Sequence, residues 1–180
     1  MQVQRRSRTK DEAAAGVAAG QFGLISRQQA VEAGFDRSAI SWRVKSGRWQ
    51  RVQPGVYAIA GIPESWEQRL LGAQLSLGGR AVVSHRAAAL LWGFLATDSA
   101  PIELSVHSSR SPGALDGVIV HRVSSLKGVR KTQGPFELTD PIRTMLDLGV
   151  VLGETTLEKS LDKGIRLRCF TGSEIYLAAD

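Results

Sequence analysis

The segment 26–59 constrains the fold most, because its local signals specify two short helices in close succession. Ser26 and Gln29 form a capping box that begins the first helix. Gly34 supplies the break after it, and Asp36 is a suitable N-cap for a second helix that runs to about Ser46. The sequence therefore predicts two short helices joined by a tight turn.

A β-hairpin is predicted directly after these helices. Strand-type residues flank the turn sequence Gln53-Pro54-Gly55, in which Pro54 suits the first central position and Gly55 a position with positive φ. An alanine-rich helix is expected in front of the segment, over 11–23. The order helix, helix, turn, helix, hairpin is that of a winged helix-turn-helix.

The positive charge of the chain is concentrated in its N-terminal third. Residues 1–62 hold ten lysines and arginines against four acids, whereas residues 63–180 hold thirteen of each, so the whole net charge of +6 lies in the first part. Such asymmetry indicates a basic binding module followed by an ordinary globular domain. We expect a flexible basic arm at 1–10, the winged helix-turn-helix at 11–62 and an α/β domain at 63–180.

The basic module is predicted to bind double-stranded DNA. On a helical wheel Ser38, Ser41, Trp42 and Lys45 lie opposite the apolar face, and Arg48 and Arg51 follow near the hairpin, where phosphate contacts are expected. The candidate DNA contacts are Arg27, Arg37, Ser38, Ser41, Trp42, Arg43, Lys45, Arg48 and Arg51. The alternative is that the basic surface serves solubility and that the winged helix binds protein.

The remainder of the chain is predicted to form a domain of mixed strands and helices, so the expected fold class is α+β. Short strands are expected at 81–85, 101–107 and 118–123, with helices between and after them, one of which begins at Pro141 with Asp140 as its N-cap. Glu103 is interpreted as a solvated strand residue, and His85 as a hydrogen-bonded residue at the start of a helix. Ser84 and His85 are expected to point to opposite faces and so not to form a catalytic pair.

The sequence supports no enzyme, cofactor or metal site. Cys169 is the single cysteine, the three histidines are widely spaced, and no nucleotide-binding glycine motif or nuclease-type Asp-x-Lys or Glu-x-Lys pair occurs. No apolar run reaches the roughly 20 residues of a membrane span. The N-terminus lacks the apolar core of a secretory signal, so a cytoplasmic protein is expected.

The ordered motifs resemble actinobacterial AbiEi-type proteins, which are antitoxins of type IV toxin–antitoxin systems or transcriptional regulators. The resemblance lies in "GLISRQQAVEAGFDRSAISWRVKSGRWQRVQPGVYAIAG", "WEQRLLGAQLSLGGRAVVSHRAAALLWGF", "PIELSV", "VIVHR" and "TDPIRTMLDL", and it covers about residues 12–180. It implies a winged helix-turn-helix followed by an α/β antitoxin domain. Many relatives carry a further endonuclease-like domain, and this chain ends where that domain would begin, as expected of a short member or a fragment.

The resemblance also implies partners and a role. The first domain would repress the chain's own operon by binding its promoter, and the second would neutralise a nucleotidyltransferase-type toxin. Because one winged helix contacts few base pairs, we expect a homodimer or an operator with two sites. Two alternatives stay open: a module that binds a toxin or another protein with only non-specific DNA affinity, and a remnant of a nuclease-linked protein.

Overall fold

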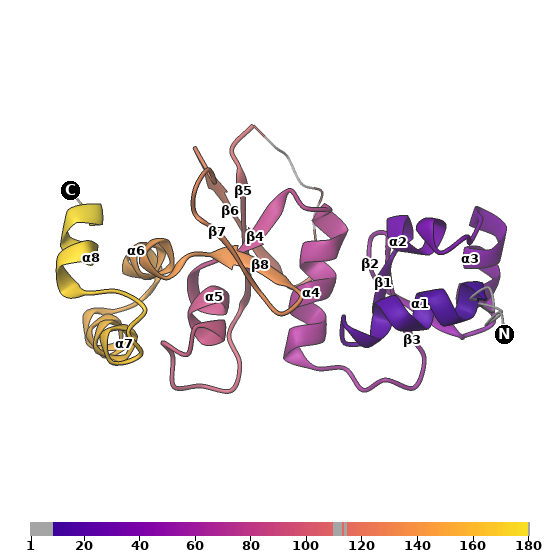
Figure 1. Cartoon of the computed structure of the whole chain (residues 1–180), viewed down its shortest axis with the longest axis horizontal. Coiled ribbons are helices and arrows are strands. Elements are labelled where there is room, and N and C mark those ends of the chain that lie inside the picture. Colours follow the sequence, from indigo (N-terminus) through magenta and orange to yellow (C-terminus); the bar gives the residue numbers. More distant parts are fainter. Residues whose placement is uncertain (1–8, 110–112, 114, 180) are drawn as a thin grey trace, which may run out of the picture. The chain divides into compact units, whose positions relative to one another are not determined.

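The computed structural model describes residues 9–109, 113 and 115–179. These residues form eight helices and two β-sheets, which confirms the α+β class (Figure 1). The chain divides into two compact units, Met1–Ser76 (unit 1) and Leu77–Asp180 (unit 2). The predicted basic arm lies outside the described residues except for its last two positions, of which Lys10 already begins a helix.

Unit 1 contains three helices, a three-stranded sheet and one longer helix. The first elements are α1 (Lys10–Ala19), β1 (Leu24–Ser26), α2 (Arg27–Glu32) and α3 (Arg37–Lys45). They are followed by β2 (Trp49–Gln53), β3 (Val56–Ile59) and α4 (Trp66–Leu77). The sheet is antiparallel in the order β1-β3-β2. The predicted hairpin is present as β2 and β3, and β1 is an additional strand that the sequence did not indicate.

Local capping sets the helix boundaries of unit 1. Ser26 and Gln29 form the predicted capping box of α2, with the Gln29 backbone N–H donating to Ser26 Oγ over 3.2 Å. The Ala39 N–H donates to Asp36 Oδ1 over 2.7 Å at the start of α3. An aromatic core lies beneath these helices, where the Trp49 ring is 5.2 Å from Phe35 and 5.7 Å from Tyr57 between ring centroids.

The division between the units differs from the boundary at 62 that the sequence predicts. Most of α4 belongs to unit 1, because its side chains bond to that unit's loops. Gln68 Nε2 donates to the Phe22 carbonyl over 2.6 Å, and Ser76 Oγ donates to the Pro54 carbonyl over 2.8 Å. The break at Gly61 and Pro63 therefore ends the hairpin without ending the unit.

Unit 2 contains a mixed five-stranded sheet and four helices. Its strands are β4 (Ala81–Val83), β5 (Ile102–His107), β6 (Val118–Val123), β7 (Arg130–Gln133) and β8 (Phe136–Thr139), in the order β6-β5-β4-β8-β7. Its helices are α5 (His85–Leu91), α6 (Pro141–Val151), α7 (Glu154–Arg166) and α8 (Gly172–Ala179). The last three form a helical group at the C-terminal end (Figure 1). Pro141 and Asp140 begin α6 as predicted.

Glu103 on β5 is not the solvated strand residue that the sequence suggested. Its side chain is fully buried and ion-paired with Arg86, whose Nη2 lies 2.8 Å from Glu103 Oε1 and whose Nε donates to Oε2 over 3.0 Å. The Arg86 backbone N–H also donates to Oε2 over 2.9 Å. Burial opposes the charge on Glu103, but these hydrogen bonds prevail and hold the pKa of its carboxyl below the ordinary value.

Two glycines in helices of unit 2 should respond oppositely to alanine. A Cβ at Gly164 of α7 would overlap the buried Phe170 ring, so Gly164→Ala is expected to destabilise by about 1–3 kcal/mol. A Cβ at the exposed Gly149 of α6 would meet nothing within 4 Å, so Gly149→Ala is expected to stabilise by about 0.5–1 kcal/mol. Urea unfolding measures the stability of both variants. Equal changes in the free energy of unfolding would contradict the close packing at Gly164.

Candidate nucleic-acid interface

Helix α3 presents one buried face and one exposed face. Ile40 is 4 % exposed and packs in the aromatic core, which fixes the rotation of the helix about its axis. Arg37, Ser41 and Lys45 lie four residues apart along the helix, so they form one row on the exposed side. The residues that hold α3 in place are therefore distinct from the residues that it offers to a partner.

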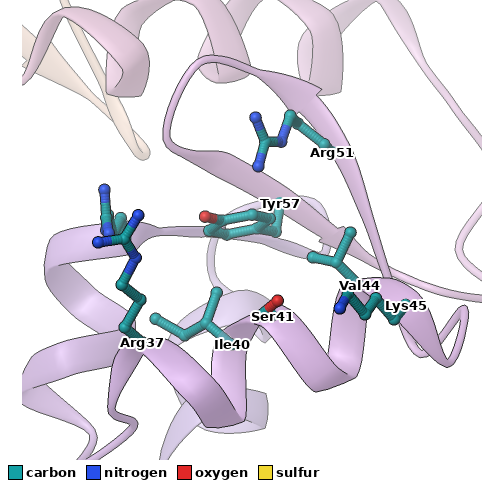
Figure 2. Close-up of a pocket in the computed structure, with 8 residues that line it drawn as sticks. Arg37, Ile40, Ser41, Val44, Lys45, Arg51 and Tyr57 are labelled. Atoms are coloured by element: carbon teal, nitrogen blue, oxygen red, sulfur yellow. The ribbon is translucent and has the colours of Figure 1, made fainter.

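A pocket of about 520 Å³ opens between this row and the hairpin (Figure 2). Its polar wall is formed by Arg27 at the start of α2, by the α3 row, by Arg51 on β2 and by Tyr57 on β3. Figure 2 shows the Tyr57 ring between Arg51 and α3. The remaining lining residues are the apolar Ile40 and Val44. We call this feature the basic pocket.

Among the described residues, four cations and no carboxylate line the basic pocket. Arg27, Arg37, Lys45 and Arg51 line it, and none of them forms an ion pair with the part of the chain that the structure describes. Arg27 and Arg37 are also the first residues of their helices, where the helix dipole disfavours a cation by about 0.3–1 kcal/mol. Helix stability therefore does not explain their placement.

Arg43 does not join this pocket, although the sequence placed it among the DNA contacts. Its Nη2 lies 2.6 Å from Asp11 Oδ1 of α1, and its guanidinium carbon lies 4.2 Å from the centroid of the Phe35 ring. Only 12 % of its side chain is exposed. Arg43 thus links α1 to α3 and covers the aromatic core, which is a structural use of the charge.

Three further candidates are exposed but lie outside the lining of the basic pocket. Trp42 is 50 % exposed, and the Arg48 guanidinium carbon lies 4.9 Å from the centroid of its ring, a cation–π contact. Ser38 is exposed on the same helix. These three residues form a second exposed group near the basic pocket, which we call the tryptophan group.

The sequence did not single out Tyr57 as a pocket residue. It is 5 % exposed and also belongs to the aromatic core, so its strand-type character was visible but its position facing α3 was not. The register Arg51↔Tyr57 between β2 and β3 brings both residues to the pocket. That register depends on the hairpin turn. The turn is the one local sequence signal that could have indicated the position of Tyr57.

Among the described residues no group of three or more histidine, cysteine, aspartate or glutamate side chains could hold a metal ion. Within the same residues, no helix is long and apolar enough to cross a membrane.

One protein-family model matches the chain, and the match falls on the segment that builds the interface. The model describes a transcriptional regulator, AbiEi antitoxin, and it covers residues 13–60. No curated protein matches the chain. Beyond residue 60 the resemblance stays a prediction. Over residues 13–60, which carry α2, α3, the hairpin and every residue of the basic pocket, the resemblance to the AbiEi-type antitoxins and transcriptional regulators is confirmed.

Proposed function

We propose that the chain is a DNA-binding transcriptional regulator of the antitoxin type that represses its own promoter in the cytoplasm. Unit 1 acts as a winged helix-turn-helix, with α3 in the major groove and the hairpin of β2 and β3 as the wing. The order of elements and the β1-β3-β2 sheet support this assignment, because the hairpin then lies next to the exposed face of α3.

The observation that carries the proposal is the acid-free basic pocket beside α3. Arg27, Arg37, Lys45 and Arg51 come from three separate elements and converge without internal counter-ions. Phosphate groups of a DNA backbone supply such counter-ions at regular spacing, and they position a protein on the duplex. Ser41 and the tryptophan group then lie where they can contact bases or sugars.

The first experiment is fluorescence anisotropy of the chain on the duplex upstream of its own gene, with a scrambled duplex beside it and salt titrated in both. We expect tighter binding to the upstream duplex. Four phosphate contacts predict that log affinity falls with log salt at a slope of about −3.6, since each contact contributes about −0.9. Equal binding to both duplexes would reject specific repression, and no binding to either would reject the DNA-binding role.

The same titration at stoichiometric concentrations gives the number of chains per duplex. One copy presents one α3, so we propose two copies on an operator with two half-sites. A saturating ratio of one chain per duplex would reject that arrangement.

A second candidate function, neutralisation of a toxin of the nucleotidyltransferase type, concerns unit 2. Large apolar side chains are exposed on its C-terminal helices: Val150 is 82 % exposed, Tyr176 69 % and Leu177 74 %. If these side chains form one contiguous patch, it would suit a protein partner. Co-expression with the neighbouring gene product, followed by purification at moderate salt, tests the idea, and a chain recovered without that partner would oppose it.

A further inference from the structure

Unit 2 contains a buried polar cluster that the proposed DNA-binding role does not use. It consists of Ser84, His85, Glu103, Ser105, His121 and Asp147, which come from α5, the neighbouring strands β5 and β6, α6 and the residue before α5. All of them except His121 are less than 8 % exposed. We call this set the histidine cluster.

A chain of hydrogen bonds joins His85 to the strand β5. Ser105 Oγ donates to Ser84 Oγ over 2.8 Å, and Ser84 Oγ lies 3.0 Å from His85 Nδ1. The Ser84 hydroxyl can accept a second hydrogen bond or donate its own proton, so it can bond to Nδ1 in either neutral tautomer of His85. A protonated His85 has only donors on its ring. Ser84 and His85 therefore do contact each other, contrary to the expectation from strand alternation, because His85 has a left-handed φ of 51°.

The second histidine limits how much charge the cluster can hold. The His85 and His121 rings are stacked, with centroids 3.5 Å apart and planes 15° apart. Two imidazolium ions at that distance would repel each other strongly. His121 Nε2 lies 3.2 Å from Glu103 Oε1, the same carboxylate oxygen that lies 2.8 Å from Arg86 Nη2.

The other charges around His85 come from α6. Asp147 Oδ1 accepts a hydrogen bond from Arg143 Nε over 2.7 Å, whereas Asp147 Oδ2 is buried and has no hydrogen-bond partner among the described residues. Burial lowers the pKa of His85; Asp147 and Glu103 oppose this effect, and His121 and Arg143 add to it. The net pKa of His85 lies below its ordinary value, so the folded unit disfavours the protonated form.

We propose that His85 is a proton-linked switch in unit 2, neutral and locking α5 onto β5 and β6 at neutral pH, and loosening them when it takes up a proton. Protonation leaves Nδ1 a donor only, so that it can no longer accept a bond from Ser84 Oγ, and it places a cation against the stacked His121 ring. The proposal is independent of DNA binding and concerns only the residues of unit 2.

The direction of the pH effect follows from linkage. Because the unfolded chain binds this proton more tightly than the folded unit, stability is greatest above about pH 6.5, the ordinary pKa of histidine. It falls as the pH drops below that value towards the folded pKa of His85, and then levels off. Each unit by which the pKa is lowered reduces the folding equilibrium constant about tenfold across this window.

His85→Asn tests the switch, because asparagine tolerates the left-handed backbone and its amide can accept from or donate to Ser84 Oγ without titrating. Urea unfolding of the full chain is measured between pH 7.5 and 5.5 through the NMR signal of the Trp92 indole N–H. This N–H donates to the Thr139 carbonyl over 2.9 Å, so its signal reports the folding of unit 2. We expect the parent midpoint to fall with pH and the variant midpoint to change much less. The matched control His107→Asn alters an exposed histidine and should behave as the parent.

The pH titration of the histidine ring NMR signals of the parent provides a second measurement, which needs no stable His85 variant. The chain has three histidines, so variants of His107 and His121 assign the signal of His85 by elimination. A His85 signal that titrates below pH 6.5 supports the switch. A signal that titrates at or above that pH overturns it, and so does a His85→Asn variant whose unfolding keeps the pH dependence of the parent.

Discussion

Replacing Lys45 and Arg51 together with glutamine is expected to weaken binding to the upstream duplex by roughly a hundredfold. Each charge-assisted hydrogen bond to a phosphate contributes about 1.5 kcal/mol, and the double variant loses two. The two side chains reach the basic pocket from different elements, α3 and β2. The salt dependence should also become shallower by about 1.8 in slope, because two fewer counterions are released.

The folded structure should tolerate this double substitution. Both residues are exposed, and neither side chain bonds to another described residue, so the free energy of unfolding should change by no more than about 0.5 kcal/mol. A matched control replaces Lys131 of β7 and Lys159 of α7, which are exposed in unit 2 and alter the net charge equally. An equal loss of affinity in both double variants would mean that overall charge, and not the basic pocket, binds the duplex.

The elements that were predictable are those whose signals are local. The Ser26 and Asp36 caps and the Pro54-Gly55 turn each act within four residues, and the structure has α2, α3 and the hairpin where these signals place them. The three-residue strand β1 has no comparable signal. It exists because Leu24 and its neighbours pair with β3, which lies 30 to 34 residues further along the chain.

Charged residues were the least predictable, since their use depends on distant partners. Arg37 and Arg43 share a short helix, yet Arg37 lines the basic pocket whereas Arg43 is bonded to Asp11. The helical wheel contained part of this answer, because Arg43 follows the buried Ile40 by three residues and so lies near the apolar face. Its partner on α1 could not be inferred from any spacing.

The buried Glu103 shows the same limit in unit 2. Alternation along β5 places it opposite Leu104, which indicates a solvated face for a sheet covered on one side. Helix α5 covers that second face, and Arg86 arrives with it to neutralise the carboxylate. Only the three-dimensional arrangement of the sheet and the helix reveals that both faces of β5 are buried.

Glu103→Gln is accordingly expected to destabilise unit 2 by about 3 kcal/mol. Glutamine fills nearly the same volume, so the loss comes from the charge: Arg86 keeps a half-buried guanidinium without its counter-ion, and His121 loses a carboxylate acceptor. We place the value at the lower end of the range for broken buried pairs because 29 % of the Arg86 side chain is exposed and solvent compensates it in part. Urea unfolding read from the Trp92 indole signal measures the change.

The pH dependence of the unfolding free energy of the same variant distinguishes the loss of the Glu103 charge from a change in packing. The folded unit holds the pKa of Glu103 below its ordinary value, so its contribution is present above about pH 4.3 and is lost as the pH falls towards the folded pKa. The difference between the parent and Glu103→Gln should therefore shrink in that acid range. Glu137→Gln, which breaks the exposed pair with Arg130 at 2.9 Å, should cost less than about 1 kcal/mol. Equal costs for the two variants, or a difference that persists in acid, would mean that Glu103 stabilises unit 2 by packing and not by its charge.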